Sequence, residues 1–315
     1  MSSSAHRAFS EIELAEAGLL TVDLIADRLQ RGQPAEAKIL VRRFQHELMT
    51  MFFSYSGWEK AILECIVELN GEARADAALA SIENWAVAPE RQVEISGVAK
   101  RWNLELDNIE ALIDTENHTE ASQRATDLRV EALALHDGIM SRVTALLTIV
   151  YEDNGDKDLQ WVLSQVMKPG SMDPDGTMPF REKVENIMLF TRSHLLPFTV
   201  TEDDEKITFM PDPCPSGARL IRDGHYESPR NNAIVREAGP LTYGRAEMPI
   251  YCCHEPSMEL SSTLRTGAPL FIVDPPEDVG ISPCKIYVYK DPAEIPEAYY
   301  QRLGLKKPED LIAVS

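Results

Sequence analysis

Residues 198–210 read Phe198-Thr-Val-Thr-Glu202-Asp-Asp-Glu205-Lys206-Ile-Thr-Phe-Met210, and the pattern of the chain changes here. Two runs with alternating apolar and polar residues flank an acidic turn, which is typical of a β-hairpin with one buried face. Most of the chain before residue 196 has helical periodicity, whereas short strand-like runs rich in Pro and Gly follow it. We therefore expect an α+β protein, with a helical N-terminal two-thirds followed by a compact, mostly β, Cys- and His-containing C-terminal third.

The helical part is predicted to be a domain of residues 1–195. Its strongest helix covers residues 120–151, where apolar residues recur with helical period up to a break at Asp153-Asn154-Gly155-Asp156. The same kind of pattern predicts further helices over residues 9–31, 37–55, 58–69, 75–85, 93–112, 158–167 and 180–194.

The C-terminal part is predicted to be a small α+β domain of residues 196–315. Besides the hairpin, strand-like runs occupy residues 219–222, 248–251, 269–273 and 284–289, and a last helix covers residues 295–303. Element boundaries of this kind are uncertain by a few residues because local patterns fade at the ends of elements.

The formal net charge of −20 over 315 residues limits the classes of partner. A nucleic-acid-binding surface needs a basic face, and anionic lipid repels an acidic one, so we expect neither partner. No apolar run approaches the roughly 18 residues of a membrane span. The N-terminus lacks the apolar core of a signal peptide, and five cysteines do not indicate a disulfide framework, so we expect a cytoplasmic protein.

Residues 211–255 hold three of the five cysteines and two of the seven histidines. Thiolate and imidazole together suit zinc, with iron as the less common alternative. The candidate metal ligands are Cys214, Cys252, Cys253 and His254. Read as a strand, Tyr251-Cys-Cys-His-Glu255 places Cys252 and His254 on one face and Cys253 and Glu255 on the other. The spacing matches no paired-knuckle zinc motif, and buried apolar cysteines are the plain alternative.

Three further residues are candidates for catalysis. Glu255 is a candidate general base, and His225 is a candidate base or fourth ligand. Arg219 belongs to a region without lysine between residues 207 and 284, and arginine binds carboxylates with two parallel hydrogen bonds, which favours a small anionic substrate. The alternative is that these arginines pair with acidic residues of the helical part. His136 and His194 are interpreted as structural histidines.

Four segments resemble a group of uncharacterised bacterial proteins. They are residues 192–206, with Glu-Asp-Asp-Glu-Lys, residues 213–220, with Pro-Cys-x-Ser-Gly-x-Arg-Leu, residues 250–254, with Tyr-Cys-x-His, and residues 287–292, and His136-Asp137 is a looser match. In those proteins the third segment often reads Tyr-Cys-x-His-Cys, so Glu255 stands where a second cysteine is expected. The resemblance implies no activity, but it leaves room for a mixed Cys, His and Glu site.

Taken together, these patterns predict a metal-dependent enzyme, with zinc as the metal, of hydrolase or lyase type. It would act on a small anionic molecule at the junction of the two parts. Two alternatives remain open. One is a structural zinc module on a helical interaction or ligand-sensing protein, and the other is a metal-free cysteine enzyme with Cys214 as nucleophile. The broad apolar faces of the long helices also predict a homodimer.

Overall fold

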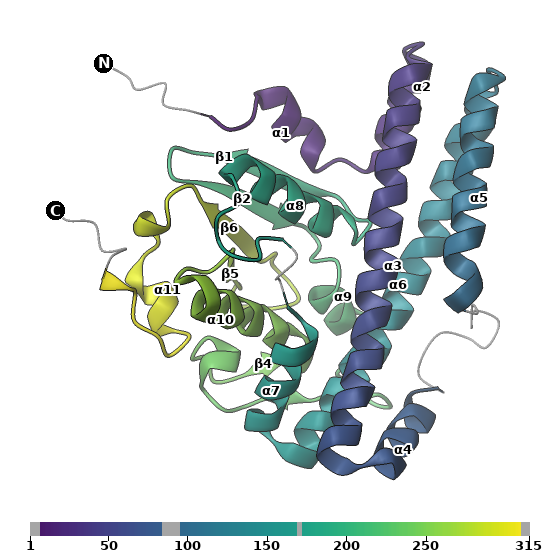
Figure 1. Cartoon of the computed structure of the whole chain (residues 1–315). Coiled ribbons are helices and arrows are strands. Elements are labelled where there is room, and N and C mark those ends of the chain that lie inside the picture. Colours follow the sequence, from purple (N-terminus) through teal and green to yellow (C-terminus); the bar gives the residue numbers. More distant parts are fainter. Residues whose placement is uncertain (1–6, 84–94, 169–171, 310–315) are drawn as a thin grey trace, which may run out of the picture.

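The computed structural model describes residues 7–83, 95–168 and 172–309. It confirms the α+β class: the N-terminal part is helical, and the strands lie in the C-terminal part (Figure 1). The helices of the N-terminal part are α1 (Glu11–Ala17), α2 (Thr21–Gln30), α3 (Pro34–Asn70), α4 (Glu72–Glu83), α5 (Ile95–Asp114), α6 (His118–Asn154), α7 (Asp156–Val166) and α8 (Phe180–Arg192). The predicted ends at residues 84–85 and 93–94 lie outside the described residues.

Two predicted helix boundaries were wrong. The pattern over residues 9–31 is two helices, because the chain turns at Gly18 and passes close to the sheet. The Phe198 N–H donates to the Gly18 carbonyl at 3.0 Å, and a Cβ at residue 18 would meet Phe198 O at 1.6 Å. Conversely, α3 runs unbroken through Gly57, where a Cβ would meet nothing within 4 Å. A single glycine costs an exposed helix only about 1 kcal/mol, which the packing of α3 outweighs.

The predicted hairpin is confirmed as β1 (Phe198–Glu202) and β2 (Lys206–Pro211), paired antiparallel with Phe198 opposite Pro211. Ile207 and Phe209 point into the core, which explains the alternating pattern of this segment. The sheet continues with β6 (Lys285–Tyr289) and β5 (Ile272–Asp274), in the order β1-β2-β6-β5. A second, two-stranded sheet joins β3 (Ile234–Val235) to β4 (Met248–Pro249).

One segment predicted as a strand is helical, and a second is a strand in its first half, β4, and helical in its second. Residues 219–222 belong to α9 (Gly217–Arg222), and residues 250–251 open the 3-10 helix η4 (Ile250–Cys253), which leads directly into α10 (His254–Thr266). Pro256 is compatible with this helix because it lies in the first turn, where the backbone N–H groups have no intrahelical acceptor. The C-terminal part also contains the 3-10 helices η3 (Pro240–Thr242) and η5 (Pro292–Glu294) and the helix α11 (Glu297–Gln301).

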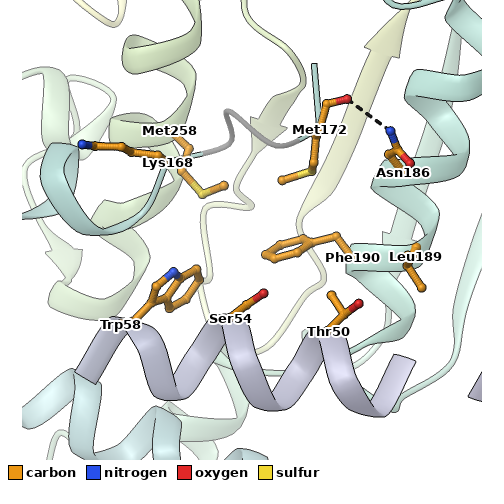
Figure 2. Close-up of a pocket in the computed structure, with 9 residues that line it drawn as sticks. All are labelled: Thr50, Ser54, Trp58, Lys168, Met172, Asn186, Leu189, Phe190 and Met258. Carbon is orange, nitrogen blue, oxygen red and sulfur yellow. Dashed lines mark hydrogen bonds between the residues drawn. The ribbon is translucent and has the colours of Figure 1, made fainter. Parts of the chain in front are cut away.

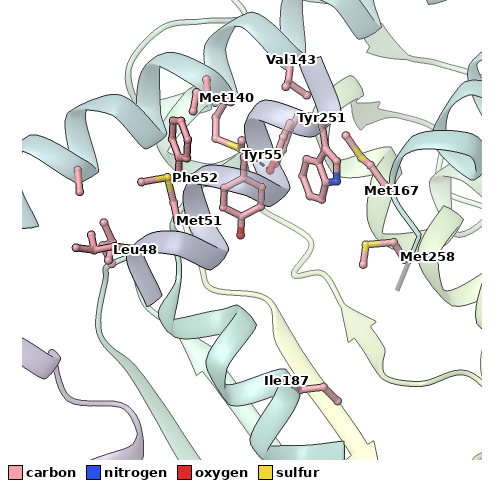
Figure 3. Close-up of a cluster of buried hydrophobic side chains, with 14 of the residues drawn as sticks. Leu48, Met51, Phe52, Tyr55, Met140, Val143, Met167, Ile187, Tyr251 and Met258 are labelled. Atoms are coloured by element: carbon pink, nitrogen blue, oxygen red, sulfur yellow. Dashed lines mark hydrogen bonds between the residues drawn. The ribbon is translucent and has the colours of Figure 1, made fainter. Parts of the chain in front are cut away.

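One hydrophobic core extends across the predicted domain boundary at residue 195. Figure 3 shows Tyr55 of α3 and Met140 of α6 beside Tyr251 of the C-terminal part. The Tyr251 hydroxyl donates to Met140 Sδ at 2.9 Å, and Tyr251 is 1% exposed. The C-terminal part is therefore anchored by its own aromatic side chain against the longest helices.

Among the described helices, α6 is the one that is long and apolar enough to cross a membrane by length and composition. Of its most apolar 18-residue window, 67% is buried inside the protein. Burial of this kind is what the central helix of a packed helical layer requires, because its neighbours cover it on several sides.

Candidate functional site

Three cysteines from three distant segments line one small cavity between the helical and β parts. The cavity consists of two adjoining hollows of about 30 and 60 Å³, which share Cys214, Ser216, His254, Glu255, Val273 and Cys284, and Cys252 lines the smaller one. We call it the thiol cavity. Of the five residues that the sequence placed in or beside a metal site, Cys214, Cys252, His254 and Glu255 are brought together here, and Cys253 is not.

Cys214 lies in the loop before α9, and the backbone of that helix turns toward its sulfur. Burial raises the pKa of the Cys214 thiol, but hydrogen bonds from the backbone N–H groups of Ala218, Ser216 and Gly217 oppose the shift. Such converging N–H groups stabilise negative charge on sulfur, because a thiolate accepts hydrogen bonds better than a thiol does.

Gly217 leaves room for a second sulfur above the same backbone. A Cβ at residue 217 would lie 2.8 Å from Cys252 Sγ and 4.0 Å from Cys214 Sγ. Carbon and sulfur do not approach so closely without displacement, so the residue at 217 must be glycine for Cys252 to occupy this position. The glycine therefore allows the two thiols to lie near each other.

The helical conformation of residues 250–255 changes which side chains share a face. As a strand, this segment would place Cys252 and His254 on one face, but Cys252 and Glu255 are three residues apart on a helical turn and face the same cavity. Cys253 points elsewhere: it is fully buried, and its thiol lies 3.8 Å from the Pro249 carbonyl. The strand prediction for these residues was therefore wrong, although Cys252 and His254 both line the cavity.

Cys284 was missed as a site residue, although it lines both hollows of the cavity. It precedes β6, which pairs with β2, and this pairing carries its side chain to the loop that holds Cys214. The sequence signal was a cysteine beside a proline at the start of a strand-like run, 70 positions from Cys214. No local pattern links residues so far apart.

The three thiols disfavour negative charge on one another. Burial raises the pKa of Cys252 well above its ordinary value, and nearby Cys214 and Cys284 raise it further. Burial also raises the pKa of Cys284, with Cys214 and Glu255 adding to the effect. Without a cation, these groups remain neutral thiols, whereas a cation bound among them would reverse the balance.

His254 is held in one tautomer at the edge of the thiol cavity. Its Nδ1–H donates to the Tyr251 carbonyl at 2.6 Å, and its Nε2 lies 3.2 Å from Glu255 Oε1. Burial opposes protonation of His254, but the Glu255 carboxylate and the carbonyl outweigh it and raise the histidine pKa. The sequence candidates His254 and Glu255 are thus coupled to each other.

A buried hydrogen-bond chain lies directly behind the cavity. Tyr55 Oη lies 2.9 Å from His194 Nε2, His194 Nδ1 lies 2.9 Å from His136 Nε2, and His136 Nδ1 lies 3.1 Å from Asp137 Oδ1. The other Asp137 oxygen accepts a hydrogen bond from Arg219. His194 also lines the cavity, and burial holds its pKa well below the ordinary value, with His136 and His254 adding to the effect.

Arg219 and His225 lie outside the lining of the thiol cavity. Arg219 forms an ion pair with Asp137, as in the alternative considered from the sequence. His225 is 7% exposed, and burial lowers its pKa to about 4, with Arg230 adding to the effect. Neither residue is positioned to contact a molecule in the cavity without a rearrangement.

The candidate donors surround the cavity without converging on one point. Within the described residues, no three side chains of Cys, His, Asp or Glu are positioned to ligate one ion as they stand. A metal ion would therefore require side-chain rotation of the cysteines or of Glu255.

Comparison with protein-family models, with curated proteins and with solved structures finds no match to this chain.

Proposed function

We propose that the protein is a zinc-dependent enzyme of hydrolase or lyase type, with Cys214, Cys252, Cys284 and Glu255 as the metal ligands. The observation that carries the proposal is the meeting of these four side chains, from three separate segments, around one cavity. Cysteines are scarce in this chain, and three of the five face this space. A chance meeting of buried cysteines has no reason to include a carboxylate and a coupled histidine.

The donor set suits a borderline-soft cation. Zinc takes thiolate, imidazole and carboxylate ligands in a tetrahedral arrangement. Cys252 and Glu255 share one face of a helical turn, as the two cysteines of a Cys-x-x-Cys zinc knuckle do. The N–H groups around Cys214 oppose the rise that burial causes in the pKa of its thiol. Because a cysteine side chain turns about χ1 alone, metal binding would require a change between its staggered rotamers.

The lining of the thiol cavity limits the chemical class of the substrate. Its described residues include no lysine or arginine, so we replace the expected anionic substrate with a small uncharged one. A bound zinc ion would supply Lewis-acid polarisation of a substrate oxygen or a water molecule. His254 would exchange a proton with the substrate, since its Nδ1 is fixed by a carbonyl and its Nε2 faces Glu255. The hydrogen-bond chain through His194 keeps the adjoining wall rigid.

Elemental analysis of the purified protein tests the ligand set. We expect about one zinc ion per chain in the wild type, as in a four-ligand site. Cys214→Ser and Cys284→Ser should lose the metal, because a serine hydroxyl is a far weaker zinc ligand than a thiolate. Cys253→Ser is the matched control: it removes a buried thiol from the adjacent residue, which does not line the cavity.

Three outcomes would overturn the proposal or its catalytic part. Wild-type protein without bound metal, after purification in zinc-containing buffer, would favour the metal-free cysteine enzyme. Equal metal loss in Cys253→Ser and Cys284→Ser would contradict the ligand assignment. Metal that is bound tightly, excludes solvent from its coordination sphere and is required for folding would favour a structural zinc module.

A further inference from the structure

A second, larger pocket lies on the other side of two aromatic rings from the thiol cavity. Its volume is about 320 Å³, and we call it the outer pocket. Figure 2 shows Thr50, Ser54 and Trp58 projecting into it from one face of α3. Phe190 of α8 and Met258 of α10 close it from other directions. A cavity of this size accommodates a small organic molecule, for which binding sites span about 300–1,000 Å³.

Trp58 and Phe190 belong to both spaces. Each lines the outer pocket and also the thiol cavity. Each ring lies near an imidazole that lines the thiol cavity. The ring centroids of Trp58 and His254 are 6.1 Å apart, and those of Phe190 and His194 are 5.7 Å apart. The two aromatic side chains therefore form the partition between the outer pocket and the thiols.

We infer that the outer pocket is the entrance to the thiol cavity and binds the non-reacting part of the substrate, an uncharged molecule with an apolar body and a hydrogen-bonding group. Trp58 and Phe190 act as its gate. This inference rests on the proposed function only in treating the bound molecule as a substrate. The route into the thiol cavity and the outer pocket can be tested without any enzymatic activity or metal.

The lining of the outer pocket determines the chemical class. The indole of Trp58, the phenyl ring of Phe190 and the thioether of Met258 offer an apolar surface. Facing it are the hydroxyls of Thr50 and Ser54, and neither of these is hydrogen-bonded within the part of the chain that the structure describes. Free hydroxyls beside aromatic rings recognise neutral molecules that carry a donor or an acceptor.

Among the described residues that line the outer pocket, the single charged one does not change this assignment. Lys168 borders the outer pocket, but its ammonium group lies 3.5 Å from the Gln165 side chain. In Figure 2 it extends away from the ring of other labelled side chains. Because the ammonium group does not point into the space, it gives no counter-charge to an anion bound there.

The small size of the thiol cavity limits which part of a molecule can enter it. Its hollows of about 30 and 60 Å³ hold a reacting group or a few water molecules, since one water needs roughly 10–15 Å³ of such space. The rest of a larger molecule must therefore stay outside, and the adjoining space that accommodates it is the outer pocket. Movement of the two rings would admit the reacting group.

The test measures how fast three methanethiosulfonate reagents label individual cysteines in the whole protein, as purified and after treatment with a chelator. The reagents carry a methyl, a benzyl or a negatively charged sulfonatoethyl group. Mass spectrometry of peptides gives separate rates for Cys214, Cys252 and Cys284, and for Cys65. Cys65 is 7% exposed and lies in the helical part, so it reports general opening of the fold.

Two substitutions should move the rates in opposite directions. Trp58→Ala removes a gate ring, and we expect benzyl labelling of Cys284 to rise about tenfold, more than methyl labelling, because the opening step is lost. Ser54→Trp fills the outer pocket and should slow both uncharged reagents by a similar factor. Phe53→Ala is the control, since Phe53 lies on the same helix but is 62% exposed and outside the pocket.

The outcomes separate the inference from its rivals. Unchanged rates in Ser54→Trp, with the fold retained, would show that the thiols are reached by another route. A parallel rise at Cys65 in Trp58→Ala would mean general unfolding, and the Ser54→Trp result then decides. Faster labelling by the sulfonatoethyl reagent than by the benzyl reagent would overturn the uncharged class. Absence of zinc would refute the proposed function but would leave the comparison of wild type with the variants valid, because each comparison is made in the same metal state.

Discussion

His136 Nε2 and His194 Nδ1 lie 2.9 Å apart, and this contact ties the middle of α6 to the segment that leads into the sheet. The Asp137 carboxylate determines which atom donates and which accepts in each of these hydrogen bonds. Asp137 accepts from His136 Nδ1–H, so His136 Nε2 must accept from His194, and His194 Nε2 must accept from the Tyr55 hydroxyl. Every ring nitrogen then has a partner, which is the condition for burying two imidazoles without a large cost.

Removing one member of this chain should leave its neighbour unpaired. In His136→Leu, the His194 Nδ1–H loses the acceptor that the fully buried His136 provides, and we expect a loss of about 1–3 kcal/mol in the free energy of unfolding. Urea titration followed by circular dichroism measures this loss. His46→Leu, at an exposed histidine, should change the stability by about 0.5 kcal/mol or less. Equal stability of both variants would contradict a stabilising role for this chain of hydrogen bonds.

The buried histidines also predict how stability depends on pH. The pKa of His225 is lowered to about 4 by burial, so the unfolded state binds a proton near pH 6.5 that the native state refuses. The free energy of unfolding should therefore fall as the pH drops from about 6.5 to 4, by at most about 1.4 kcal/mol per pH unit for this group. His194 has the same sign. His225→Gln should flatten the slope.

Measurement between about pH 5 and 6.5 isolates this effect from most carboxyl groups, which titrate lower. Glu259 contributes with the opposite sign, because burial raises its pKa to about 7 and the native state keeps a proton that the unfolded state releases. That contribution is common to wild type and His225→Gln and cancels in the comparison. Identical slopes in the two proteins would show that His225 is protonated in the folded state.

A buried carboxylate, Glu259, lies in the C-terminal part. Glu259 is 1% exposed and accepts hydrogen bonds from Arg302 at 2.8 Å, from the Val273 N–H at 2.6 Å and from the Tyr243 hydroxyl. Arg302→Met removes the cation and leaves the carboxylate buried, and we expect a loss of about 3–5 kcal/mol in stability at pH 8. Chemical denaturation measures it. The double variant with Glu259→Gln should recover part of the loss, and no recovery would refute the pairing.

Local pattern was enough to predict the elements whose burial repeats along the chain. The period of α6 follows from residues such as Leu128, Val143 and Leu146, which are all buried on the same helix. The hairpin of β1 and β2 follows from the alternation ending in Ile207 and Phe209, together with the acidic turn between the strands. Such patterns are read over a few residues, and tertiary contacts only reinforce them.

The candidate site was predictable only in part, because its geometry depends on distant pairing. Cys214 and Cys252 were identified from their clustering with histidine. Cys284 reaches them only because β6 pairs with β2. Cys253 was kept beside Cys252 because the sequence did not decide between the two cysteines. Tyr251 packs against α6 and the chain continues as a helix, which turns Cys253 away. Tertiary packing decided the secondary structure here.

Gly217→Ala is the substitution that tests the thiol cavity with the smallest change. Alanine favours helix more than glycine does by about 1 kcal/mol, so at the first residue of α9 it would otherwise be neutral or stabilising. The new Cβ would lie 2.8 Å from Cys252 Sγ, and we expect displacement of that thiol at a cost of about 1–3 kcal/mol, with loss of bound zinc. Urea unfolding and elemental analysis measure the two effects.

Gly239→Ala is the matched control, because its backbone is extended and a Cβ there meets nothing within 4 Å. A Gly217→Ala protein that is as stable as wild type and retains its zinc would show that Cys252 has room to move without consequence, and would remove Cys252 from the ligand set.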